Sequence, residues 1–148
     1  MTAITHSIEI SRSPEEVFAY LDDLARHGEW QEQVTATRVE PAGATGIGTR
    51  AVETRRVGNR KQTFVYEITE HDPPRSFAFR GVSGQIRPIG KGTVAAIADG
   101  RSRVTIELDF SGHGLGRLML PMVRNQARKQ VAKDQRRLKQ RLEGDDAA

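Results

Sequence analysis

The sequence contains no cysteine. This absence excludes a disulfide framework, a thiolate nucleophile, a zinc ribbon and an iron–sulfur cluster, and it is typical of proteins in a reducing compartment. No apolar run approaches the roughly 18 residues that a membrane-spanning helix needs. The first ten residues alternate apolar and polar side chains and so lack the apolar core of a signal peptide. We therefore expect a cytoplasmic protein without a transmembrane segment.

Hydrophobic and aromatic residues are sparse, at 36% and 5% of the 148 positions. A chain of this length still fits one domain, which buries roughly 70% of the surface of its unfolded chain and can therefore hold a core. We expect a single domain over residues 1–143, followed by a disordered tail over residues 144–148.

Patterns that mark metal or cofactor chemistry are also missing. No G-x-S-x-G nucleophile motif is present, and the glycines of 112–116 do not match a dinucleotide fingerprint. We predict neither a metal nor a cofactor. His113 is still a candidate lone acid or base, since imidazole often has that role in enzymes, although it can equally cap a turn. The histidines lack metal-ligand spacing and should be solvated or singly hydrogen-bonded; they are His6, His27, His71 and His113.

The basic residues are concentrated near the end of the chain. Between Arg124 and Arg141 there are eight basic residues and one acid, Asp134, so this segment carries +7 and the rest of the chain −3. Such a helix can contact an anionic surface or an acidic partner, but basic runs are more often a solvated face. With no aromatic residue among the charges and no DNA-binding motif, we expect no specific nucleic acid partner.

The first part of the chain combines one strand with two short helices. Residues His6–Ile10 alternate with the period of a strand. Ser13 then has the features of an N-cap, with Pro14 at the first helical position and Glu16 completing a capping box. A second, shorter helical turn is expected over Arg26–Trp30.

Between Val34 and Gly112 we expect six further strands and no helix. Gly58-Asn59 and Asp99-Gly100 are two-residue hairpin turns, and Pro88 should lie at an edge or a bulge. The expected strands are Val34–Val39, Thr49–Val57, Gln62–Glu70, a short strand around Phe77 and Phe79, Ile86–Ala98, and a last strand through Val104–Phe110.

One of these strands has polar residues on both faces, over Thr49–Arg56. It is either an edge strand at the rim of the sheet, which we favour, or it turns Arg50, Glu53 or Thr54 inward. An inward arginine could hold a carboxylate or enolate oxygen of a ligand.

A long helix is expected over Leu115–Leu142. Its apolar residues form two stripes that are rotated by roughly 140° from one another, and Pro121 near the change should kink the helix. We expect the first segment, through Met122, to cover the mouth of a cavity and the second to clamp the sheet. The stripes are Leu115, Leu118, Met119 and Met122, then Ala127, Val131, Leu138 and Leu142.

Several short motifs occur in a characteristic order: Ile8–Phe18, then Trp30, then Thr69–Arg75, then Gly92-Thr93. With the order of expected elements, they resemble the START-like helix-grip superfamily, and in particular its polyketide cyclase/dehydrase and lipid-transport branch. The resemblance covers about Ile4–Leu142. It implies an α+β helix-grip fold, in which a seven-stranded curved antiparallel sheet surrounds a long C-terminal helix and two short helices follow the first strand.

The resemblance also implies a cavity between sheet and long helix for a lipid, a polyketide or another small apolar molecule, of roughly 300–1,000 Å³. It supplies no family-wide catalytic set. Each aromatic residue of the wall either contacts the ligand or only fills the core, and a buried Tyr66 would need a hydrogen-bond partner. The predicted ligand-binding residues are Trp30, Phe64, Tyr66, Phe77, Phe79, Leu115, Met119 and Met122.

Three functions are open at this point. The favoured hypothesis is a binding protein or carrier for a small apolar molecule. The alternative is a polyketide cyclase/dehydratase-type enzyme, in which the cavity orients a poly-β-ketone and Tyr66, His113 or an inward arginine moves the protons. A third is an interaction module whose basic helix docks an acidic partner. The ligand, any reaction and the oligomeric state stay open, and a homodimer is allowed.

Overall fold

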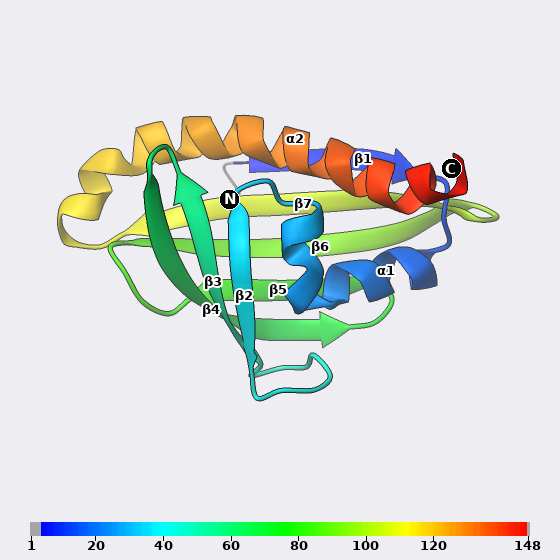
Figure 1. Cartoon of the computed structure of the whole chain (residues 1–148), viewed down its shortest axis with the longest axis horizontal. Helices are drawn as coiled ribbons and strands as arrows, with labels where there is room; N and C mark the ends of the chain where they lie inside the picture. The colour runs from blue at the N-terminus through cyan, green and yellow to red at the C-terminus, as the bar shows by residue number, and fades with distance from the viewer. Residues whose placement is uncertain (1–3, 148) are drawn as a thin grey trace.

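The computed structural model describes residues 4–147, with side chains through Gly144. Its strands form one seven-stranded antiparallel sheet in the order β1-β7-β6-β5-β4-β3-β2, and Figure 1 shows this sheet strongly bent, with the long helix α2 along one side. The strands are β1 (Ile4–Ile10), β2 (Val34–Glu40), β3 (Arg50–Val57), β4 (Arg60–Asp72), β5 (Ser76–Gly81), β6 (Ile86–Ala98) and β7 (Arg101–Gly112). The helices are α1 (Pro14–Asp22), η1 (Leu24–Glu29), η2 (Gly114–Met119) and α2 (Leu120–Ala147), of which η1 and η2 are 3₁₀ helices.

The predicted helix-grip architecture is confirmed in its element order and in its sheet. Both expected hairpins are present, because Val57 pairs with Arg60 across Gly58-Asn59 and Ala98 pairs with Arg101 across Asp99-Gly100. Gly58 in the first turn and Gly100 in the second have positive φ, the conformation that these tight turns require. No helix among the described residues is long and apolar enough to cross a membrane.

Helix α1 begins as its sequence predicts. The Ser13 Oγ accepts a hydrogen bond from the Glu16 backbone N–H at 3.2 Å and donates one to the Glu16 carboxylate at 3.1 Å. Pro14 occupies the first helical position. The helix buries Val17 and Leu21 in the main apolar cluster, which also contains Ile10, Val104 and Leu138. Each buried side chain of this size adds roughly 2 kcal/mol of stability.

The sheet has an inner face, which carries α1, η1 and α2, and an outer face. Strand register places alternate residues on each, so that Ile8, Val104 and Val94 point inward while their neighbours point outward. On β5 the inward rings of Phe77 and Phe79 lie over Gly92 and Gly90 of β6, where a Cβ would overlap the rings. These two glycines are therefore required by the aromatic residues beside them.

Pro88 lies on β6, which is an interior strand. It pairs with Phe110 of β7, whereas the ladder between β5 and β6 ends with the pair Arg80–Ile89 and does not include Pro88. The missing N–H of Pro88 therefore faces a local edge and removes no ladder hydrogen bond.

The break in the C-terminal helix differs from the predicted kink. The chain first forms η2 and only then α2, so Pro121 lies in the first turn of α2, where its missing N–H interrupts no helical hydrogen bond. The predicted kink inside one continuous helix from Leu115 is therefore wrong, although the chain does divide into two segments here.

The second segment clamps the sheet as predicted. Helix α2 packs chiefly on β1 and β7. Leu138 is fully buried in the main apolar cluster, and the buried Gln135 side chain hydrogen-bonds to His6 of β1 and to the Val104 carbonyl of β7. The helix runs to Ala147, and Ala148 lies outside the described residues. The domain end at residue 143 and the disordered tail therefore stay predictions.

Candidate ligand-binding site

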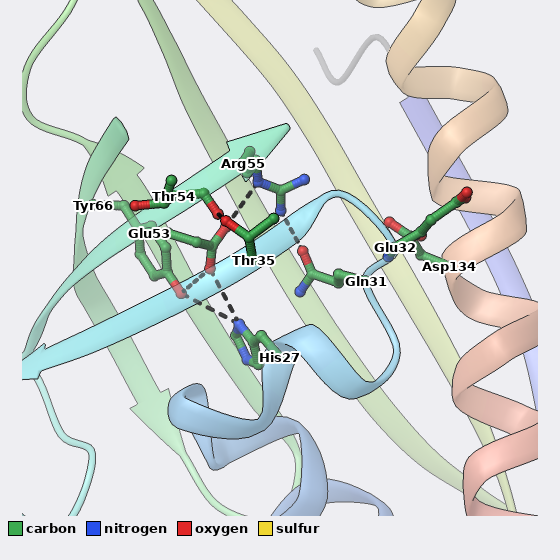
Figure 2. Close-up of polar contacts among 9 residues, drawn as sticks. All are labelled: His27, Gln31, Glu32, Thr35, Glu53, Thr54, Arg55, Tyr66 and Asp134. Carbon is green, nitrogen blue, oxygen red and sulfur yellow. Dashed lines mark hydrogen bonds and ion pairs between the residues drawn. The ribbon is translucent and has the colours of Figure 1, made fainter. Parts of the chain in front are cut away.

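A group of polar side chains lies on the inner face of the sheet, at the end away from α2. Glu53 and Arg55 share the inward phase of β3, Tyr66 projects from the neighbouring strand β4, and His27 approaches from η1. Figure 2 shows these side chains pointing toward one another, with Gln31 beside Arg55. We call Glu53, Arg55, Tyr66 and His27 the polar cluster.

Tyr66 connects the two sides of the polar cluster. Its hydroxyl donates to the Glu53 Oε2 at 3.2 Å and lies 3.3 Å from the His27 Nδ1. The His27 Nε2 is 3.0 Å from the backbone carbonyl of Leu21. Because a carbonyl can only accept, the Nε2 carries a hydrogen, and Nδ1 is the nitrogen that faces Tyr66 and Glu53. Tyr66 therefore meets the partner that its burial requires.

Glu53 is a buried carboxylate with a charged partner. Its residue is 2% exposed, and its Oε1 accepts a hydrogen bond from the Arg55 Nε at 2.8 Å. Burial by itself raises the pKa of Glu53, but the neighbouring His27 and the positive charge of Arg55 outweigh it and lower the pKa to about 2. The carboxylate is therefore ionised at neutral pH, and Arg55 is held in place between it and the Gln31 side-chain oxygen.

Tyr66 has the opposite shift. Burial, and then the negative charge of Glu53, raise its pKa well above 10.0, because both disfavour a phenolate. Tyr66 is therefore a neutral hydrogen-bond donor over the physiological pH range.

Apolar and aromatic side chains surround the polar cluster. The rings of Tyr66 and Phe79 are 5.4 Å apart, and those of His27 and Trp30 are 5.5 Å apart. Trp30 Nε1 and Thr37 Oγ1 are buried without a hydrogen-bond partner among the described residues, and Thr37 pairs directly with Glu53 in the ladder between β2 and β3. The surroundings thus contain polar atoms that an additional molecule could satisfy.

The predicted ligand-binding residues fall into two groups. Trp30 and Tyr66 are buried beside the polar cluster, and Phe64, Phe77 and Phe79 are half-buried on the inner face. The structure brings these five side chains to one side of the sheet. The remaining three lie on η2 and the start of α2, where they are exposed to solvent: Leu115, Met119 and Met122. Their predicted lining role stays a prediction.

The inner face is only partly covered. Although α2 packs on β1 and β7, several large apolar side chains that point inward from β4, β5 and β7 remain half-buried and could still bury surface against a ligand. They include Phe64, Phe77, Phe79, Ile106, Leu108 and Phe110.

Two surface hollows occur elsewhere. One, of about 420 Å³, lies mainly over outward-facing residues of β5, β6 and β7 such as Ala78, Ile89 and Lys91. The other, of about 540 Å³, lies along α2 beside Lys133 and Arg136. Neither lies between the sheet and α2, so the enclosed cavity stays a prediction. Within the described part of the chain, no group of three or more His, Asp or Glu side chains could hold a metal ion.

Sequence reasoning missed part of the polar cluster. The edge position favoured for β3 is wrong, since β2 covers that edge. Of the candidates for an inward residue, Glu53 points inward, whereas Arg50 and Thr54 share the outward phase. Arg55 lies on the inner face two residues after Glu53, a same-face spacing that the sequence shows. His27 was expected to be solvated or singly bonded, and no local pattern indicates its burial.

His113, the other candidate acid or base, lies apart from the polar cluster. It is exposed at the start of η2, with its Nε2 3.4 Å from the Ser111 hydroxyl.

Comparisons with known proteins agree with this fold. A family model described as polyketide cyclase / dehydrase and lipid transport matches residues 1–143. Solved structures with similar folds include TTHA0849 from Thermus thermophilus, at 20% identity, TM-score 0.78 and coverage of 94% of this chain and 95% of that chain. A START superfamily protein from Mycobacterium smegmatis has 11% identity, TM-score 0.79 and coverage of 95% and 97%. The Zhui aromatase/cyclase from Streptomyces sp. R1128 has 13% identity, TM-score 0.80 and coverage of 95% and 92%. No curated protein sequence gives a significant match.

Proposed function

The chain belongs to the polyketide cyclase/dehydrase and lipid transport family, and from that premise we propose that it binds a small apolar molecule on the inner face of its sheet. The ligand carries an oxygen substituent, which the polar cluster recognises. The observation that carries this proposal is the position of the polar cluster beside inward-facing apolar side chains that the helices leave half-buried. Sites for small molecules typically combine apolar walls with a few placed polar groups.

Arg55 is the member of the polar cluster best suited to contact a ligand. Its Nε donates to Glu53 and its Nη2 to Gln31, which leaves further N–H donors of the guanidinium unused. Its side chain is 25% exposed, against 3% for Glu53. The buried carboxylate thus orients the guanidinium, and the free donors can meet a carboxylate, enolate or carbonyl oxygen.

Phe64 is the apolar residue best placed to work with Arg55. It pairs with Glu53 across the ladder between β3 and β4, on the same inner face, and it remains half-buried. A flat apolar ligand that covers this ring would gain burial there while its oxygen meets Arg55.

Two fluorescent probes test the proposal: a neutral naphthalene derivative and the same compound with a carboxylate. We expect both to bind saturably. Arg55→Gln should weaken the carboxylate probe about tenfold, the effect of one charge-assisted hydrogen bond, and leave the neutral probe unchanged. Phe64→Ser should weaken both. Native mass spectrometry of the purified protein would then search for a co-purifying molecule of this class.

The matched control is Arg56→Gln, because Arg56 is the adjacent arginine of β3 and points to the outer face. It should change neither affinity. Equal effects of the two arginine variants, or no saturable binding of either probe, would contradict the proposal. Unchanged affinity for the neutral probe reports that Arg55→Gln is folded.

A second candidate function is an aromatase/cyclase-type reaction on a poly-β-ketone. The favouring observation is the Tyr66 hydroxyl, which lies within hydrogen-bond reach of both Glu53 and His27 and, while it stays protonated, could donate a hydrogen bond to a developing enolate. With a synthetic poly-β-ketone thioester, Tyr66→Phe should abolish the cyclised product while binding of the neutral naphthalene probe survives. His113→Ala should still form the cyclised product. Loss of that product in His113→Ala alone would locate the chemistry at η2.

A further inference from the structure

One end of the molecule exposes a group of large apolar side chains. Among the described residues, four of the six exposed large hydrophobic side chains fall within eight positions of the chain. Leu115 is 73% exposed and Leu118 82%. In Figure 1 this segment, yellow, extends beyond the ends of the neighbouring strands. We call Leu115, Leu118, Met119 and Met122 the apolar tip.

The backbone beneath the apolar tip is held against the sheet. The His113 N–H donates to the Gln85 carbonyl at 2.7 Å. Gly116 is buried against the same Gln85, where a Cβ would overlap that residue's backbone. The contact anchors η2 on the loop between β5 and β6, so the apolar side chains are presented by a docked segment.

The charged residues of the chain segment that contains and follows the apolar tip are basic as far as Lys133. No acidic residue occurs between Asp109 and Asp134. Helix α2 continues from Met122 with Lys129, Lys133 and Arg136, which recur at the spacing of one helical face and are exposed. None of these three side chains has a hydrogen-bond or ion-pair partner in the described part of the chain. We call Lys129, Lys133 and Arg136 the basic stripe.

We propose that the apolar tip and the basic stripe form a docking surface for an anionic lipid bilayer. The leucine and methionine side chains enter the interface between headgroups and acyl chains, and the basic stripe contacts lipid phosphates. Apolar insertion and electrostatic attraction together are the combination by which peripheral proteins bind such membranes. This docking goes beyond the proposed ligand binding and does not depend on it.

Charge and shape favour a bilayer over the other possible occupants. A symmetric contact between two copies would pair this surface with itself, so that the basic residues of both copies would share one interface and repel one another. Protein interfaces usually centre on tryptophan, tyrosine or arginine anchors in pockets, whereas the apolar tip consists of flexible aliphatic and thioether chains at a protruding end. A bilayer accepts such side chains without a complementary pocket.

A single labelled cysteine tests insertion directly, because the natural chain has none. Leu118→Cys with an environment-sensitive fluorophore should shift to shorter wavelength with vesicles of equimolar phosphatidylcholine and phosphatidylglycerol, and not with phosphatidylcholine alone. The matched control is Ile89→Cys, which is 56% exposed on the outer face of the sheet and should not shift with either vesicle.

Two double variants separate the contributions to vesicle binding. Leu115→Ser with Leu118→Ser should weaken partitioning by about tenfold. Lys129→Gln with Lys133→Gln should weaken it by about 30-fold on anionic vesicles, at roughly a factor of five per basic residue near the surface. Arg50→Gln with Arg80→Gln gives the same net charge on the outer face and should change partitioning by less than about twofold.

Specific results would overturn the proposal. They are no shift of the Leu118 label on anionic vesicles at low salt, an equal shift of the Ile89 label, or equal losses in the two charge variants. A Leu118 shift that appears without vesicles and grows with protein concentration, with a dimer in sedimentation, would instead assign the apolar tip to self-association. All of these readouts are independent of the naphthalene probes, so failure here and failure of ligand binding are distinguishable.

Discussion

The inner face of the sheet has two halves that are built differently. Near β1, β6 and β7, the side chains of Ile10, Val17, Val104 and Leu138 are fully buried in an apolar cluster between α1, α2 and the sheet. Near β3 and β4, the corresponding positions hold the polar cluster, covered by the six-residue η1. The larger apolar cluster therefore lies in the first half, whereas the second half combines the polar cluster with a smaller apolar cluster of Leu24, Ala51, Tyr66 and Ile68.

The covering elements explain this difference. Helix α2 packs on β1 and β7, where it buries Leu138 in the main apolar cluster and Gln135 between His6 and the Val104 carbonyl. In the other half Glu53 is tolerated because the Arg55 Nε and the Tyr66 hydroxyl each donate to one of its two oxygens, while the His27 Nδ1 lies 3.6 Å away. A mutation in each half therefore allows its effect on the free energy of unfolding to be compared with its effect on probe binding.

The largest effect is expected in the apolar half. Leu138→Ala should destabilise the protein by about 3 kcal/mol, because it leaves a cavity at a fully buried position. Urea unfolding measures this loss, and binding of the neutral naphthalene probe below the transition should be unchanged. A loss below about 1 kcal/mol would mean that this half is not the main core.

Glu53→Gln should cost about 2 kcal/mol at neutral pH, since it removes a buried charge that others are arranged to satisfy. The Glu53 pKa is about 2 in the folded protein, against 4.5 as its ordinary value. Its contribution is therefore present above pH 4.5 and is lost as the pH falls toward 2. The stabilities of wild type and variant should converge over that range, and a constant difference across it would contradict the assignment.

Tyr66→Phe should have a smaller effect, about 1 kcal/mol, because it removes a hydroxyl that donates to Glu53. The matched control is Tyr20→Phe, whose hydroxyl donates to Glu29 at 2.9 Å in the apolar half. Thermal unfolding should show a loss in both variants, but only Tyr66→Phe should alter binding of the carboxylate probe. An altered affinity in the control would show that the two halves are coupled.

Asp134→Asn should have the smallest effect, and the opposite pH dependence. Burial raises the pKa of Asp134, although hydrogen bonds from Gln130 and the Glu32 N–H partly oppose the shift. A raised pKa gives stability that is full below the unfolded-state value of 3.8 and is lost as the pH rises through the folded-state value. The variant should therefore gain up to about 1 kcal/mol at neutral pH in urea unfolding.

The asparagine can retain both hydrogen bonds, because both donors meet the same Oδ1 of Asp134. A loss of stability at neutral pH would show that the negative charge itself is required between α2 and the segment before β2. Figure 2 shows this side chain directed toward Glu32.

Much of the fold could be predicted because its signals are local. Ser13 and Pro14 begin α1 as expected, Gly58-Asn59 closes its hairpin, and β6 has the predicted bounds of Ile86 and Ala98. The break before α2 was misjudged, because a proline near an apolar run can either kink a helix or start one. Only the packing of Gly116 against Gln85, which makes η2 a separate segment, distinguishes these cases.

The site was less predictable because its contacts are distant in sequence. Tyr66 was selected for its position on an apolar strand face, but its partners His27 and Glu53 lie 39 and 13 residues away. Exposure also could not be read from the apolar pattern. Met119 and Met122 have the same residue type and helical spacing whether they line a cavity or face solvent, and the structure places them in solvent.

By itself, the sequence determined the order of strands and helices, the alternation of inward and outward residues and the basic character of α2, because capping, turn formation and side-chain periodicity act between near neighbours. Only the tertiary structure decided that Glu53 is buried and ionised, that Tyr66 is its donor and that the apolar tip is exposed. Burial and pKa depend on which distant segments cover a side chain, and η1 covers one end of the sheet while the described residues leave η2 open to solvent.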